Sequence, residues 1–205
     1  MVVTDIVDMD KKRKKIYLDG EYVFALYNQE IYRYNIKTGA ELDKDIYREI
    51  DCELLPKRVK SRALYILKSS LKTEKQLFDK LLEGGYAHKY AAIGVEYAKS
   101  FGYIDDLRYA EYFVENSCNG RSRRDIEQRL FQRGIDRDII RKVLDDLRPD
   151  TQDDVEAVWV ALRKKSITRE NISELDYEKR GKIFAYLMRK GFSTDIIGKV
   201  LHCDI

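Results

Sequence analysis

The sequence has few of the residues that break regular structure, and no long apolar run. Its 205 residues include two prolines and eleven glycines, which excludes a loop-rich sandwich or a disordered chain and favours helices. No apolar stretch approaches the roughly 18 residues of a membrane span. The first fifteen residues have no apolar core before their charges, unlike a secretory signal. We therefore expect a cytoplasmic protein with no membrane association.

The residues used for metal binding and nucleophilic catalysis are equally scarce. The three cysteines, Cys52, Cys118 and Cys203, lie far apart, and the histidines are only His88 and His202. A structural zinc site needs four clustered ligands, so we expect reduced, mostly buried thiols and no metal. Neither a glycine-rich phosphate-binding motif nor a nucleophile–base motif occurs. The sequence predicts a non-enzyme without a cofactor.

The N-terminal region has the two-residue period of β-strands. Asp19 and Gly20 separate the runs Ile16–Leu18 and Glu21–Tyr27, and this pair favours the positive φ angles of a hairpin turn. A third run, Ile31–Ile36, has the same alternation. We expect a small antiparallel sheet with this run as its third strand.

Such a sheet is marginally stable alone and needs a covering element. Leu42, Ile46 and Ile50 recur every four residues, which predicts a short helix over it. Residues 1–55 would then form an N-terminal β-hairpin region with a short helix. An alternative use of the tyrosines here is a stacking platform for single-stranded nucleic acid.

From Pro56 onward the pattern is helical and repeats. Apolar helices are centred on Ala63, Ala110 and Ala157, which lie 47 residues apart. In each unit a second helix ends at a glycine, with a leucine four residues before it and a large apolar residue after it. This pattern is typical of a left-handed helix C-cap, and the glycines concerned are Gly85, Gly134 and Gly191. A third helix follows in every unit.

The repeat predicts a mainly α protein made of three tandem three-helix units. Their expected bounds are residues 56–104, 105–148 and 149–205, and the third unit carries an insertion near residues 167–177. Each unit is too small to bury its own faces, so stacking on a neighbour should complete its core. We expect a curved, elongated array preceded by the small sheet.

The junction between the first two units carries a recognisable string. Residues 102–110 read Gly-Tyr-Ile-Asp-Asp-Leu-Arg-Tyr-Ala, with a glycine ending one helix and an aspartate capping the next. With the 47-residue repeat, this string closely resembles the hallmark of the RecX family, regulators of the RecA recombinase. The motif residues, whose role the resemblance gives as mostly structural, are Tyr103, Asp105, Asp106, Arg108, Tyr109 and Ala110.

The resemblance implies a non-enzymatic modulator, an inhibitor, of the RecA recombinase. Such a protein binds the RecA–single-stranded-DNA filament as a monomer and limits its growth, ATP hydrolysis and strand exchange. It would thereby regulate recombination, DNA repair and the SOS response, and contact DNA weakly or through the filament. The alternative is an independent helical DNA-binding protein or transcriptional regulator, because three-helix units can resemble helix-turn-helix modules.

Charge is nearly balanced overall but unevenly distributed. Residues 57–80 and 121–142 each hold eight basic residues, whereas residues 41–53 and 145–156 are acidic. Separate basic and acidic stretches suit a partner that presents both phosphates and protein, although ordinary solvated helix faces would look similar. Arg123 and Arg124 stand at a helix start, where cations are unfavourable and a ligand would explain them. The predicted contact residues are Arg121, Arg123, Arg124, Arg129 and Arg133, with Lys57, Arg58, Lys60, Lys72 and Lys75.

Overall fold

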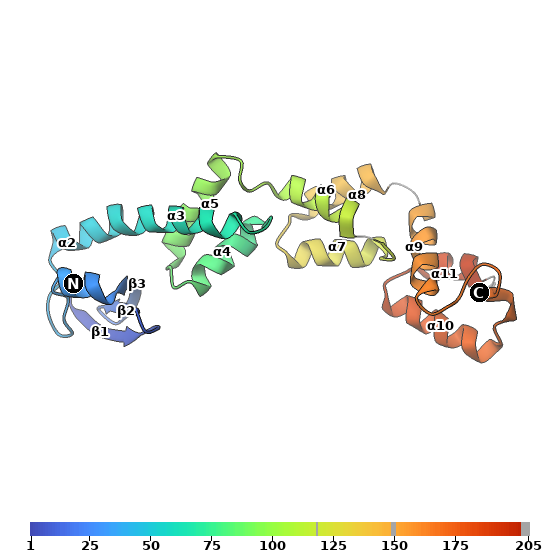
Figure 1. The fold of residues 1–205 in the computed structure, drawn as a ribbon, viewed down its shortest axis with the longest axis horizontal. Helices are drawn as coiled ribbons and strands as arrows, with labels where there is room; N and C mark the ends of the chain where they lie inside the picture. Colours follow the sequence, from blue (N-terminus) through green and yellow to red (C-terminus); the bar gives the residue numbers. More distant parts are fainter. Residues whose placement is uncertain (118, 149–150, 202–205) are drawn as a thin grey trace. The chain divides into compact units, whose positions relative to one another are not determined.

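The computed structural model describes residues 1–117, 119–148 and 151–201. It divides into two compact units, Met1–Asp105 and Asp106–Ile205. Helices dominate both units, and the one small sheet belongs to the first (Figure 1). The mainly helical fold with an N-terminal antiparallel sheet is therefore confirmed.

The sheet has three antiparallel strands in the order β1-β2-β3. They are β1 (Val3–Asp8), β2 (Arg13–Leu18) and β3 (Glu21–Tyr27). The predicted hairpin turn joins β2 to β3, with φ of 50° at Asp19 and 89° at Gly20. Both residues are left-handed, as a turn that follows the natural twist of the two strands requires.

The predicted third strand, Ile31–Ile36, is wrong. The chain forms helix α1 (Asn28–Arg33) there, and β1 supplies the third strand instead. Helix α1 starts with a capping arrangement in which the Glu30 carboxylate accepts the backbone N–H of Tyr27 at 2.8 Å. A glutamate that satisfies a free N–H in the first turn stabilises a helix start, so local capping prevailed over the alternating pattern.

The short helix expected after the sheet is present but does not stand alone. Helix α2 (Lys44–Glu49) is capped by Asp43 and continues through a π-helical segment, η1 (Ile50–Leu54), into α3 (Leu55–Leu67). Because the helical residues are continuous, no loop separates the N-terminal region from the first repeat.

The first repeat consists of α3, α4 (Glu74–Glu83) and α5 (His88–Ser100). Its apolar side chains join those of the sheet in a single core. The sheet also binds the end of α4, where Arg13 Nη1 donates to the Gly84 carbonyl at 2.6 Å and the Tyr22 hydroxyl to that of Gly85 at 2.5 Å. These donors satisfy carbonyls that a helix end leaves free.

The second and third repeats each contribute three helices. Their bounds are α6 (Asp106–Ser117), α7 (Arg123–Gln132), α8 (Arg137–Leu147), α9 (Thr151–Arg163), α10 (Tyr177–Arg189) and α11 (Thr194–Leu201). Each repeat has its own hydrophobic cluster. The expectation of a shared core is therefore wrong for these two repeats, because their buried apolar residues form two separate clusters.

The predicted glycine caps are confirmed in all three repeats. Gly85, Gly134 and Gly191 have φ of 82°, 87° and 83°. In each case the amide of the next residue donates to the leucine carbonyl of the last helical turn, as Ile135 does to Leu130 at 3.2 Å. This hydrogen-bond pattern is the Schellman motif, which needs a left-handed residue where the chain reverses.

The thiols differ from expectation. Cys52 is free and exposed rather than buried, because it lies on the outer side of η1. Cys118 and Cys203 lie outside the described residues. Within the part of the chain that the structure covers, no helix is long and apolar enough to cross a membrane, and no group of acidic, cysteine or histidine side chains is placed to hold a metal ion.

Replacing Gly134 tests the cap geometry. Gly134→Val places a β-branched side chain at φ 87°, which costs about 1–2 kcal/mol or more, and the free energy of unfolding from urea titration should fall by that amount. The matched control is Gly181→Val, because Gly181 lies inside α10 and has open space around its Cα. Equal effects of the two changes would contradict the left-handed assignment.

Candidate functional site

The arginine cluster, defined as Arg121, Arg123, Arg124, Arg129 and Arg133, surrounds α7. Two of its members begin the helix, one precedes it and two lie near its end. Ser122 caps the helix start, its Oγ accepting the Asp125 amide at 3.1 Å. The same hydroxyl donates to the Lys190 carbonyl at the end of α10, at 2.8 Å. The predicted N-cap thus also connects the second repeat to the third.

Arg123 serves the fold rather than an open surface. Its Nη1 donates to the carbonyls of Leu144 and Arg148, each at 2.9 Å, and its Nη2 pairs with Asp145. Its backbone N–H donates to Asp154 Oδ1 at 3.0 Å. The guanidinium therefore caps the end of α8, where a cation is favourable. The argument that a ligand must explain a cation at this helix start does not hold for Arg123.

A largely buried ion pair completes this junction. Arg148 Nη2 lies 3.2 Å from Asp154 Oδ1, and the side chains are only 10% and 16% exposed. Burial raises the pKa of Asp154, although the Arg123 amide and the Arg148 guanidinium both act to lower it. Because Arg148 also donates to the Arg121 carbonyl at 3.2 Å, this pair joins α9 to the segment before α7. Part of the acidic stretch is thus used inside the protein.

The remaining arginines differ in how far they are engaged. Arg133 Nε donates to the Tyr109 hydroxyl at 3.1 Å, and its guanidinium lies 4.7 Å from the Phe113 ring centroid. It therefore holds α7 against α6.

Arg124 alone in the cluster is exposed, and it forms no ion pair with any residue that the structure describes. Arg124 is the member with its charge most available to a partner.

Asp125 gathers two other members of the cluster. Its Oδ2 lies 2.8 Å from Arg129 Nε and 3.2 Å from Arg121 Nη1. Burial acts to raise the pKa of Asp125, but the hydrogen bonds from Arg129 and Arg121 outweigh it and hold that pKa below its ordinary value. Arg121 and Arg129 are therefore available to phosphates only in competition with this carboxylate.

The lysine cluster, defined as Lys57, Arg58, Lys60, Lys72 and Lys75, lies on α3 and around the start of α4. Arg58 pairs with Glu30 and lies 4.9 Å from the Tyr27 ring centroid, so it connects α3 to α1 and β3. Lys57 is exposed and has no ion-pair partner in the described chain. Lys75 is exposed, and Lys72 is half-buried. Arg58 is thus structural, whereas the lysines remain candidate contacts.

An aromatic ladder adjoins Lys60, and the sequence reasoning missed it. Lys60 Nζ lies 5.2 Å from the Tyr97 ring centroid, Tyr97 meets Phe101 edge-on at 5.0 Å, and Phe101 stacks on Tyr103 at 6.1 Å. Phe101 is 60% and Tyr103 57% exposed. The available signal was an aromatic residue on each side of Gly102, beyond the end of α5. Exposed rings beside a lysine suit stacking with bases or with a protein side chain.

Residues 102–110, which resemble the RecX hallmark, begin with exposed residues and end with residues that pack inside the second repeat. Asp106 begins α6, Tyr109 accepts the hydrogen bond from Arg133, and Ala110 is fully buried. Tyr103 belongs to the aromatic ladder, while Asp105 and Arg108 are exposed. Tyr109 and Ala110 therefore act in packing.

Two tyrosines of the N-terminal region are used in packing. Tyr22 is half-buried with its hydroxyl on the Gly85 carbonyl, and burial raises its pKa to about 12. Tyr34 is buried and donates to Glu49 at 2.7 Å. Because Tyr22 and Tyr34 are used in packing, the stacking alternative fails for them.

Comparisons with known proteins agree along the whole chain. Residues 3–43, 105–144 and 152–201 match the RecX N-terminal domain and the second and third RecX three-helix domains. The curated "Regulatory protein RecX" of Caldanaerobacter subterraneus subsp. tengcongensis is 31% identical over 204 residues, covering 98% of this chain and 99% of that protein. This chain belongs to the RecX family. RecX is a family of regulatory proteins, so the membership favours regulation over catalysis.

Other RecX proteins extend the comparison. The Clostridium acetobutylicum regulatory protein is 30% identical over 200 residues, covering 95% of this chain and 92% of the relative. A crystal structure of regulatory protein RecX has a TM-score of 0.63 at 24% identity over 99% of both chains, which supports the fold. RecX from Lactobacillus salivarius has a TM-score of 0.60 at 26% identity, over 72% of this chain and 95% of that one.

Neighbouring arginines give a matched test of the cap on α8. Arg123→Ala leaves two carbonyls and the Asp145 carboxylate without their side-chain donor, so the free energy of unfolding should fall by about 1–3 kcal/mol. Arg124→Ala should change it by less than about 0.5 kcal/mol, because that side chain is exposed. Chemical denaturation of both variants measures the difference. Equal stabilities would show that Arg123 does not cap α8.

Asp125 gives a pH test. Its folded pKa is lowered, so its contribution to stability is present above the unfolded value of about 3.9 and is lost as the pH falls through the folded pKa. A carboxyl-carbon NMR titration of Asp125 should give a midpoint below about 3.9. Arg129→Gln should raise that midpoint, and a midpoint unaffected by this change would contradict the pairing.

Proposed function

We propose that this RecX-family chain is a non-enzymatic inhibitor of the RecA recombinase. It binds the RecA–single-stranded-DNA filament as a cytoplasmic monomer and limits filament growth, ATP hydrolysis and strand exchange. Through this activity it regulates recombination, DNA repair and the SOS response. The observation that carries the proposal is family membership along the whole chain, together with the resemblance of residues 102–110 to the hallmark of RecA regulators.

The contacts of the basic side chains support a division among the predicted contacts. Arg58, Arg123 and Arg133 have most of their hydrogen-bonding capacity used within the protein and act as positioning residues. The proposed direct contacts are one exposed arginine and four lysines, of which two are exposed and two half-buried, with Arg121 and Arg129 contributing when a phosphate displaces Asp125. These direct contacts are Arg124, Lys57, Lys60, Lys72 and Lys75.

A composite partner suits this surface. Nucleic-acid binding uses cations for phosphates and aromatic faces for bases, and the first repeat presents Lys60 beside the aromatic ladder of Tyr97, Phe101 and Tyr103. Exposed aromatic residues are also frequent anchors in protein interfaces. A filament offers DNA and protein together, so both kinds of contact can form in one complex.

The decisive measurement is DNA-stimulated ATP hydrolysis by RecA with increasing amounts of the protein. The rate should fall. Inhibition at a small fraction of the RecA concentration would favour capping of filament ends, and inhibition only near equal concentration would favour lining of the filament groove. No change at any ratio would contradict the proposal, and sequence-specific duplex binding without an effect on RecA would favour an independent DNA-binding regulator.

Arg124→Glu tests the surface. It should weaken filament binding and ATPase inhibition, because the side chain is exposed and its charge is reversed. If Arg124 contacts a phosphate of the single strand, Arg124→Ala should reduce the log–log salt dependence of binding by about 0.7. Arg141→Glu is the control, since Arg141 is an exposed α8 cation outside the proposed contacts. Wild-type binding by a folded Arg124→Glu variant would remove Arg124 from the contact set.

A further inference from the structure

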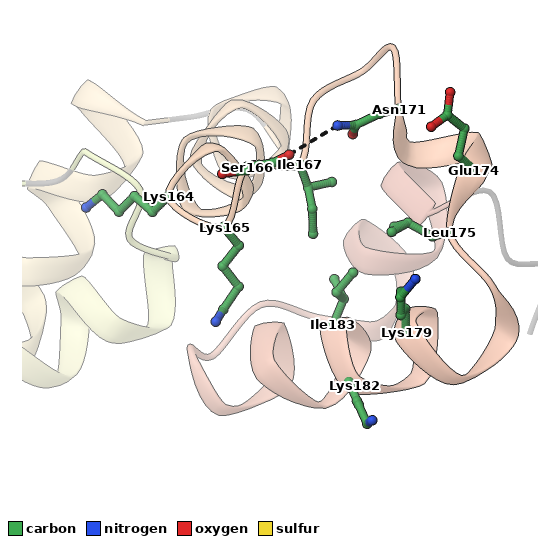
Figure 2. A pocket seen from close by; sticks show the side chains of 10 residues that line it. All are labelled: Lys164, Lys165, Ser166, Ile167, Asn171, Glu174, Leu175, Lys179, Lys182 and Ile183. Carbon is green, nitrogen blue, oxygen red and sulfur yellow. Dashed lines mark hydrogen bonds between the residues drawn. The ribbon is translucent and has the colours of Figure 1, made fainter.

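The third repeat contains an open pocket of about 720 Å³ beside its insertion (Figure 2). Residues from the turn after α9, from the insertion and from α10 line it. The first and second repeats have no corresponding insertion in their sequence. The pocket is therefore a feature of the third repeat that the shared three-helix architecture does not require.

The insertion forms one wall of the pocket, and hydrogen bonds hold it in place. Asn171 Oδ1 accepts the Thr168 amide at 2.9 Å, and Asn171 Nδ2 donates to the Ser166 carbonyl at 3.1 Å. Arg180 Nε donates to the Leu175 carbonyl at 3.0 Å. Fixing the backbone of extra residues costs conformational entropy, and these hydrogen bonds offset part of that cost. The wall is thus positioned by specific contacts at both ends.

The floor of the pocket is aliphatic. Ile167, Leu175 and Ile183 point toward one another in Figure 2, and both isoleucines are buried whereas Leu175 is half-buried. None of the lining residues is aromatic. This surface suits an aliphatic side chain better than a nucleobase, because bases bind single-strand proteins by stacking on aromatic rings.

The rim is strongly basic. Its four lysines are Lys164, Lys165, Lys179 and Lys182, against one acidic lining residue, Glu174. Lys165 and Lys179 stand on either side of Ile183 in Figure 2, whereas the amines of Lys164 and Lys182 point away from the three aliphatic side chains. Lys179 and Lys182 form only exposed ion pairs, with Asp176 at 3.2 Å and Glu178 at 2.6 Å, which contribute little and can be exchanged. Lys164 is exposed and has no ion pair among the described residues.

We propose that this pocket binds an acidic peptide segment of a protein partner. Carboxylates of the peptide pair with the lysine rim, and one aliphatic side chain enters between Ile167, Leu175 and Ile183. Glu174 repels any anionic group beside it, but it can accept backbone N–H groups, which a peptide offers and a phosphate backbone does not. The inference goes beyond the proposed regulation of RecA, and its test uses no recombinase, so each can fail without the other.

The first test uses synthetic probes with the unaltered protein. A fluorescent peptide of glutamate and aspartate with one central leucine should bind, as measured by anisotropy. Replacing that leucine by serine should weaken binding about tenfold, since a buried leucine contributes roughly one tenfold step or more. An oligothymidine of equal length should bind more weakly than the leucine peptide. Tighter binding of oligothymidine, or no effect of the leucine, would overturn the proposal.

The second test locates the binding site. In protein with labelled isoleucine methyl groups, the leucine peptide should shift the signals of Ile167 and Ile183. The signals of Ile126 and Ile140, in the core of the second repeat, should stay unchanged. Equal shifts at all four residues, or none at the pocket, would overturn the assignment without any substitution that could impair folding.

The third test reverses the rim charge. Lys165→Glu with Lys179→Glu should weaken binding of the leucine peptide by about tenfold or more, because like charges then face each other. The control, Lys37→Glu with Lys142→Glu, changes the net charge equally at exposed positions outside the pocket and should weaken it less than about threefold. Melting temperatures establish that both variants fold. Equal losses in the two variants would overturn the proposal.

Discussion

The arrangement of each repeat depends on one backbone geometry, the left-handed residue that ends its second helix. At Gly134 the chain reverses, and the amide of Ile135 returns to the Leu130 carbonyl. This reversal sets the direction of the third helix, so that its apolar face meets those of the first two. The corresponding turns of the other two repeats also bind neighbouring elements. Arg13 donates to the Gly84 carbonyl in the first repeat, and Ser122 donates to the Lys190 carbonyl in the third. One local constraint thus orders both the repeat and its attachments.

Charged residues do two kinds of work in this chain. Arg123 and the Arg148–Asp154 pair connect helices by several directed hydrogen bonds, which a planar guanidinium makes more readily than a lysine ammonium. The preference for arginine around α7 is therefore largely explained by the fold. Cations without such roles, Arg124 and Lys57 among them, remain for a partner.

Because the three repeats share one architecture, the differences between them are where function can reside. The first repeat adds the aromatic ladder with Phe101 and Tyr103, and the second presents Arg124. The third adds the insertion and its lysine-rimmed pocket. Under the proposed function, such a distribution would let each repeat make a different contact with the filament.

The sequence by itself determined the features that depend on neighbouring residues. The hairpin at Asp19 and Gly20, the glycine caps and the helix order follow from local φ preferences and apolar period, and all were predictable. The strand predicted at Ile31–Ile36 was wrong because the alternation of apolar and polar residues carries no information about hydrogen bonds. It could not indicate that Glu30 accepts the Tyr27 amide at the start of a helix, or that it pairs with the distant Arg58. Only the tertiary structure decided the role of Arg123, since its partners lie 21 to 31 residues away. The positions of basic residues in the sequence cannot distinguish a side chain that is hydrogen-bonded within the protein from one that is available to a ligand.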